Sequence, residues 1–275
     1  MRIIIYTYYN SPWDLESGDD VRIHRIPASL AKAKTGVVAF NLSASTTYST
    51  MTIDNVVYIS LPRRFYSLVS RILRWKKHYD LNPLIKLTHY IDELITAIKL
   101  RRYLEKADMV IVFGAMTLFS FMLRLLKFRG FIVYDTLGNY AQTLYLRSRR
   151  SLVELLRYGL YLALHKLQIE SSDIVVYPSK TDLDNAMRMF KPARAFIVPN
   201  PTPICFESLE EYISLRNRRR DHNRVYFLLL AGGRGRGNED AVRTTIEVFN
   251  GLPPEKFRLI ITGPWQDMKK LTRRL

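Results

Sequence analysis

The sequence has little of the chemistry that holds disulfide-stabilised or metal-centred proteins together. One cysteine, Cys205, occurs among 275 residues, which excludes an internal disulfide framework and gives no sign of a zinc site. No acidic pair such as Asp-x-Asp stands at the end of an expected strand, so we expect no metal. We expect no cofactor. We therefore expect a reducing, cytoplasmic location, with peripheral contact to the cytoplasmic face of a membrane as an option.

Long apolar runs are also missing. The longest uncharged stretch, Met109–Leu123, is too short to cross a bilayer comfortably, and it divides into a strand, a Gly114-Ala115 turn and a helix. At the start of the chain, the β-branched run within Met1–Tyr9 indicates a first strand rather than a secretory leader. We predict no membrane span.

Acidic residues are scarce: 25 Asp and Glu stand against 42 Lys and Arg, for a net charge of +17. Such an excess attracts nucleic acid, anionic lipid or nucleotide phosphates. Between Arg63 and Lys106, eleven basic residues face four acidic ones, with aromatic residues among them. This stretch suits an anionic membrane surface or is simply a solvated helix face. Nucleic acid is less favoured because no helix-turn-helix, RNA-recognition or zinc-finger pattern is present.

Strand and helix patterns alternate through the first two hundred residues. Continuous apolar runs predict strands at 2–8, 36–42, 56–61, 108–113, 130–135, 173–177 and 195–198. Helical spacing predicts helices at 21–34, within 63–107, after 113, and at 151–168 and 181–190. Apolar runs without polar alternation indicate strands covered on both faces. The sequence therefore predicts an α/β protein with a doubly wound, parallel, Rossmann-like sheet.

The pattern begins again after a linker. We place a first domain at 1–203, a charged linker at 204–224 and the start of a second Rossmann-like domain at 225–275. The last segment contains a strand at 225–230, a helix at 239–250 with Asn238 as its N-cap, and a strand at 257–262 that ends at Gly263-Pro264.

A glycine-rich loop joins the first strand and helix of the second domain. Gly232 and Gly233 let the backbone approach a ligand, and the next helix begins with free N–H groups. Arg234 and Arg236 add positive charge that suits a diphosphate. We interpret the loop, including Asn238, as a diphosphate-binding site. The alternative is an ordinary turn with solvated arginines.

Four segments, in this order, resemble the family-4 retaining glycosyltransferases, whose GT-B fold has two Rossmann-like domains facing each other across a cleft. They are ESGDDVRIHRIPASL, DIVVYPSKTDL, AFIVPNPTPICF, and FLLLAGGRGRGNEDAVRTTIEVF followed by KFRLIITGP. The resemblance implies transfer of a sugar from a nucleotide-sugar donor to an acceptor, which could be lipid-linked, without a metal. It makes 1–203 the acceptor-side domain and 225–275 part of the donor-side domain.

The resemblance also assigns residues. It implies that the donor diphosphate meets Gly232, Gly233, Arg234, Arg236 and Asn238, with Gly263 and Pro264 in a second donor-side loop. On the acceptor side, Gly18 and Asp19 match the N-terminal glycine loop, although a helix-capping surface turn explains them equally well. Asp135 ends a strand at the binding edge of the sheet and could line the acceptor, or it could cap the next turn. The sequence identifies no catalytic residue.

Two expectations about the protein as a whole remain open. A complete donor domain would need on the order of a hundred further residues. We therefore expect a C-terminally incomplete chain, inactive alone, or one that a companion chain completes. The alternative is a non-catalytic module that binds an anionic membrane or nucleic acid through its basic surface.

Overall fold

The computed structural model of the protein describes residues 2–7, 18–33, 36–43, 48–65, 67–68, 83–114, 117–138, 152–200, 210, 213–214, 225–230 and 236–262. The chain divides into two compact units, one formed mainly by residues 22–201 and the other mainly by residues 202–275.

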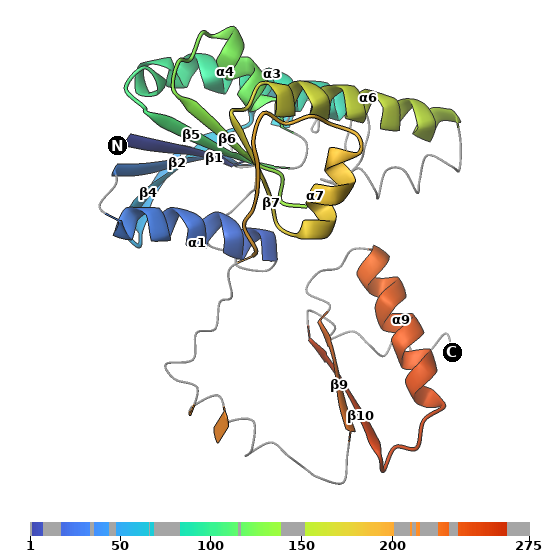
Figure 1. The fold of residues 1–275 in the computed structure, drawn as a ribbon. Coiled ribbons are helices and arrows are strands. Elements are labelled where there is room, and N and C mark those ends of the chain that lie inside the picture. The colour runs from blue at the N-terminus through green and yellow to red at the C-terminus, as the bar shows by residue number, and fades with distance from the viewer. Residues whose placement is uncertain are drawn as a thin grey trace. The chain divides into compact units, whose positions relative to one another are not determined.

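The first unit is built on an eight-stranded sheet (Figure 1) in the order β3-β4-β2-β1-β5-β6-β7-β8. Its strands are β1 (Arg2–Thr7), β2 (Gly36–Ser43), β3 (Ser49–Ile53), β4 (Val56–Pro62), β5 (Met109–Phe113), β6 (Phe131–Asp135), β7 (Ile174–Tyr177) and β8 (Ala195–Ile197). All neighbouring pairs are parallel except β3 and β4. The prediction of a doubly wound α/β fold is confirmed.

Helices cover both faces of this sheet. They are α1 (Gly18–Lys32), α3 (Pro83–Leu104), α4 (Phe119–Leu125), α6 (Leu152–Glu170) and α7 (Lys180–Met187). Figure 1 shows α3, α4 and α6 on one face and α1 on the other. Side chains of β1 alternate between the two sides: Ile4 and Tyr6 pack in the core under α3 and α4, and Ile3 and Ile5 pack against α1. This alternation explains why the strand is apolar at consecutive positions.

Strand β3 was not predicted, and it makes one edge of the sheet antiparallel. It pairs with β4 through a two-residue turn in which Asp54 and Asn55 have φ of 49° and 62°. Asp and Asn tolerate this left-handed backbone, and such turns are typical of tight hairpins. Because four of the five β3 residues are exposed, its sequence, STMTI, lacks the apolar run that marked the other strands.

Two helix starts differ from the sequence prediction. Helix α1 begins at Gly18 instead of Val21, and it continues past Pro27. Helix α9 (Arg236–Asn250) begins before Asn238, so Asn238 is inside the first turn rather than at the N-cap. The predicted helix start is therefore three residues too late, and the prediction of that cap is wrong.

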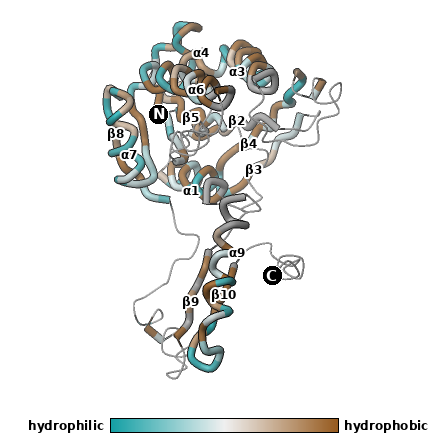
Figure 2. The backbone as a smooth tube through the Cα atoms, turned by 90° about the vertical axis from the view of Figure 1, so that its right-hand side faces the viewer, coloured by the Kyte–Doolittle hydropathy of each residue, from teal (hydrophilic) through white to brown (hydrophobic). Residues whose placement is uncertain are grey.

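The second unit repeats the strand–helix–strand arrangement on a smaller scale. Strands β9 (Val225–Leu230) and β10 (Phe257–Thr262) pair in parallel and α9 connects them. Val242 and Ile246 of α9 are buried against Leu229, Leu259 and Ile261. Figure 2 shows hydrophobic residues along β9, as in the strands of the first unit.

Candidate functional site

The carboxyl edge of the first sheet, where its parallel strands end, is the expected place for a ligand. In open α/β sheets, ligands bind outside the carboxyl ends of the strands where the strand order reverses. Here the order reverses between β1 and β5, because β2 follows on one side of β1 and β5 lies on the other. Charged residues are buried close to this edge, and they define two polar clusters.

The first cluster joins Arg22, in the second turn of α1, to Asp135 at the end of β6. Both side chains are almost completely buried, and Arg22 is 0% exposed. Arg22 Nε donates to the two carboxylate oxygens at 3.1 and 2.9 Å, and Nη2 donates to Oδ2 at 2.7 Å. This two-point geometry is the strong form of an arginine–carboxylate pair.

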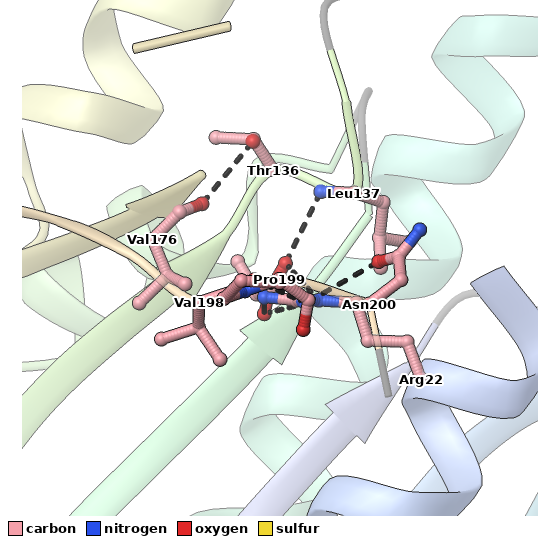
Figure 3. A network of polar contacts seen from close by, with 8 residues as sticks. Arg22, Thr136, Leu137, Val176, Val198, Pro199 and Asn200 are labelled. Atoms are coloured by element: carbon pink, nitrogen blue, oxygen red, sulfur yellow. Dashed lines mark hydrogen bonds and ion pairs between the residues drawn. The ribbon is translucent and has the colours of Figure 1, made fainter. Parts of the chain in front are cut away.

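Arg22 also holds the segment that follows β8. As Figure 3 shows, the guanidinium lies beside residues 198–200. Nη1 donates to the carbonyl oxygens of Val198 at 2.6 Å and Pro199 at 3.0 Å, and to Oδ1 of Asn200 at 3.3 Å. All three guanidinium nitrogens are thus occupied by acceptors from the protein. Arg22 acts as a structural clamp between α1, β6 and the end of the first unit.

Asp135 receives further support from its own turn. Its Oδ1 accepts a hydrogen bond from the N–H of Leu137 at 3.2 Å, and Leu137 has a φ of 58°. Burial raises the pKa of the Asp135 carboxyl, and the Arg22 and Leu137 contacts oppose that shift. The turn-capping alternative from the sequence is therefore observed. A role of Asp135 toward an acceptor stays a prediction.

The second cluster surrounds Glu93 of α3, which is 0% exposed. Its Oε1 accepts from Thr117 Oγ1 at 2.5 Å and from the Tyr6 hydroxyl at 3.4 Å, and its Oε2 accepts from the N–H of Leu118 at 2.9 Å. Burial, followed by the Glu93 charge, holds the pKa of Tyr6 well above its ordinary value. The cluster ties the loop after β5 to α3, next to the point where the strand order reverses.

The predicted site residues fall into two groups. Asp135 is described in full, and Gly18, Asp19, Arg236 and Asn238 are placed by their backbone in the first turns of α1 and α9. The residues Gly232, Gly233, Arg234, Gly263 and Pro264 lie outside the described residues.

Sequence reasoning missed Arg22, Glu93 and their contacts. A charge between Val21 and Ile23 in an otherwise apolar helical window was the available signal for Arg22. His24, on the same helix as Arg22, is packed: its Nε2 lies 3.2 Å from Asp54 Oδ2, and its Nδ1 lies 3.4 Å from the Tyr58 hydroxyl.

Within the described part of the chain, no group of three or more His, Cys, Asp or Glu side chains is arranged to hold a metal ion. None of the helices in that part combines the length and apolar character needed to cross a membrane.

No protein-family model matches the sequence, and no curated protein matches it. Solved structures, however, match its fold along the whole chain. Sucrose-phosphate synthase from Thermosynechococcus elongatus matches with a TM-score of 0.67 at 13% identity, over 100% of this chain and 66% of that one. The chain has the GT-B fold.

Two more structures agree. The α,α-trehalose-phosphate synthase (UDP-forming) from Burkholderia vietnamiensis matches with a TM-score of 0.58 at 15% identity, over 99% of this chain and 67% of that one. The Anabaena protein HepE, in complex with UDP and glucose, matches with a TM-score of 0.53 at 10% identity, over 100% and 64%. The protein thus spans about two thirds of the length of these GT-B structures.

Proposed function

We propose that this protein belongs to a glycosyltransferase that moves a sugar from a nucleotide-sugar donor to an acceptor. The observation that carries the proposal is the match of the whole chain to the fold of sucrose-phosphate synthase. The trehalose-phosphate synthase is named as UDP-forming and HepE holds UDP and glucose. A UDP-sugar is accordingly the donor to test first.

The donor diphosphate would bind between β9 and α9. Parallel pairing of β9 and β10 with α9 between them supports this site, because such a unit brings both strand ends and the helix N-terminus to one edge. Gly232 and Gly233 would give the phosphates room. Arg234 and Arg236 would neutralise the charge that develops on the leaving diphosphate.

Three further residues would complete the donor side. Asn238, in the first turn of α9, would contribute to the phosphate site. Gly263 and Pro264 follow β10, so their loop would lie beside the β9–α9 loop. In this assignment, 225–275 is the donor-side part and 204–224 is the linker.

The acceptor would meet the carboxyl edge of the first domain, 1–203. Gly18 and Asp19 begin α1, the helix that follows the central strand β1, and the strand order reverses beside that strand. Asp135 marks the same edge at the end of β6. Arg64, which is exposed just after β4 at this edge, supports an acceptor that carries phosphate, including a lipid-linked one.

Isothermal titration of the whole chain with UDP tests the donor site. We expect saturable binding that Arg236→Gln weakens about tenfold, the usual scale of one charged phosphate contact. Arg243→Gln is the matched control, because Arg243 is exposed seven residues later in the same helix. It should leave the affinity within about twofold.

Two results would count against the proposal. If UDP does not bind, or if both variants bind it like the natural chain, the diphosphate assignment fails. Binding to duplex DNA or anionic vesicles without binding to UDP would instead favour the non-catalytic module.

A further inference from the structure

A cavity of about 340 Å³ opens at the amino edge of the sheet, the edge opposite the proposed sugar-transfer site. Its walls come from the end of α3, the end of α4 and the turns that lead into β5 and β6. Ala107 precedes β5 and Gly130 precedes β6. The volume is at the lower end of those that hold small ligands.

The inner wall of the cavity is apolar. Leu104 is 4% exposed and Leu123 is fully buried, and the partly buried Leu126 and Phe128 complete this wall. Two chain neighbours of the lining residues are exposed apolar side chains: Leu125 is 61% exposed and Phe131 is 56% exposed.

The rim of the cavity is basic. Arg101, Lys127 and Arg129 line it, and Glu105 is the only acidic lining residue. Arg101 Nε pairs with Glu105 Oε1 at 3.1 Å. No acidic residue in the described part of the chain pairs with Lys127 or Arg129. Two cations are thus available beside an apolar wall.

The wall is held in place by Arg124. Its Nη1 donates to the carbonyl oxygens of Phe128 at 2.9 Å and Gly130 at 3.3 Å, and its Nη2 pairs with Asp173 Oδ2 at 2.6 Å. Gly130 has no room for a side chain, because a Cβ would lie 2.8 Å from the carbonyl oxygen of Asp108. The turn that carries Lys127 and Arg129 is therefore fixed before any ligand arrives.

We propose that this cavity binds an amphiphile with an aliphatic chain and a phosphate head group, the chain on the Leu104–Leu123 wall and the phosphate at Lys127 and Arg129. Nucleic acid would use the cations but not the apolar wall. A neutral lipid would use the wall but not the cations. Only a ligand with both parts uses both halves of the site.

Titration of the whole chain with short-chain phosphatidic acids, below their micelle concentrations, tests the proposal. We expect dioctanoyl phosphatidic acid to bind at least about tenfold more tightly than dibutanoyl phosphatidic acid, because each added methylene buries more apolar area against the Leu104–Leu123 wall. Dioctanoyl phosphatidylcholine and inorganic phosphate should bind more weakly by a similar factor.

Two paired variants assign the binding to the cavity. Lys127→Gln with Arg129→Gln should weaken binding of dioctanoyl phosphatidic acid about tenfold. Arg188→Gln with Lys191→Gln removes the same charge from two exposed residues that do not line the cavity, and should change binding less than about twofold. Equal loss in both variants would overturn the proposal, as would inorganic phosphate binding as tightly as the amphiphile.

Vesicles separate the two sources of such a ligand. If the variant with Lys127→Gln and Arg129→Gln also loses binding to phosphatidylcholine vesicles that contain phosphatidic acid, the ligand is a membrane lipid. If only the soluble amphiphile is bound, the ligand is a free phosphorylated lipid, and the same chemistry is supported.

Discussion

The two units of the chain share a strand–helix–strand arrangement but differ in how deeply their apolar side chains are buried. In the first unit, Tyr6, Val112 and Tyr134 are 0% exposed, and helices cover both faces of the sheet. In the second unit, Val242 and Ile246 are the buried apolar residues among those described, and Leu229, Leu259 and Ile261 are only partly buried. Because hydrophobic stabilisation follows buried apolar area, the described elements of the second unit should open at lower free energy.

The units also differ in buried charge. The first unit encloses the Arg22–Asp135 pair and Glu93, whereas no ion pair occurs among the described residues of the second unit. Buried charges are tolerated where every partner is fixed, and removing one partner is costly. Perturbing the first unit while following amide exchange in both units therefore tests whether they open separately.

The largest effect is expected for Arg22→Met. This change leaves Asp135 as an uncompensated buried carboxylate and removes the donors to Val198 and Pro199. We expect a loss of about 3–5 kcal/mol in the free energy of unfolding, measured by urea denaturation. Amides of β1 and β5 should lose protection against exchange, and those of β9 and β10 should not.

Two controls make that result specific. Arg25→Met alters an exposed arginine one turn later in α1 and should cost less than about 0.5 kcal/mol. Combining Arg22→Met with Asp135→Asn should recover part of the loss, since no charge is then stranded. If β9 and β10 lose protection in step with β1, the two units open together and the contrast between them fails.

The strands and the contacts of Arg22 and Glu93 differ in how well the sequence predicts them. Strands β1, β2, β4, β5, β6 and β7 were predictable because burial on both faces leaves continuous apolar runs. Strand β8 was predictable because it is apolar, although Phe196 and Ile197 are exposed at the sheet edge. Strand β3 was not, because its residues are exposed. The partner of Arg22 lies 113 positions away at Asp135, and no local pattern encodes a contact at that separation. Glu93 was missed for the same reason, since its partners lie in β1 and in the loop after β5.

The pH dependence of the free energy of unfolding is a second test of how deeply the first unit is buried, because this unit contains the buried His165 and His89. Burial lowers the pKa of His165 from its ordinary 6.5 to about 4, and it does the same for His89. The unfolded chain therefore takes up these protons at a higher pH than the folded chain. Each histidine's contribution is complete above its ordinary pKa and is lost as pH falls toward 4. The loss is on the order of 2–3 kcal/mol per histidine.

His165→Phe should remove one of these two contributions. The ring packs between Tyr161 and Phe190, and the Tyr134 hydroxyl keeps its hydrogen bond to the carbonyl oxygen of Gly114 at 2.9 Å. Urea denaturation between pH 7 and pH 4.5 should show a weaker pH dependence than in the natural chain. An unchanged slope would show that folding does not lower the pKa of His165.

Substitution of alanine for glycine at two positions should change the stability of the protein in opposite directions. Gly130→Ala would bring a Cβ within 2.8 Å of the Asp108 carbonyl oxygen, and we expect a cost of about 1–3 kcal/mol. Gly159 lies inside α6, and apart from its own helix backbone and its chain neighbours nothing lies within 4 Å of an added Cβ, so Gly159→Ala should stabilise the protein by about 0.5–1 kcal/mol. Thermal unfolding of both variants measures the difference. Equal shifts would contradict the close packing before β6.

The smallest expected effect is at the start of α7. Ser179 Oγ accepts from the N–H of Asp182 at 3.1 Å and donates to the Asp182 carboxylate at 2.6 Å, which is the geometry of an N-cap. Ser179→Ala should therefore cost about 1 kcal/mol, and Ser179→Thr, which keeps the hydroxyl, should cost less. Because α7 joins β7 to the edge strand β8, exchange should increase first at the amides of α7 and β8. A loss that spread evenly through β1, β5 and β6 would mean that this sheet edge does not open separately. Burial depth would then not determine local stability within the first unit, as we expect it to between the two units.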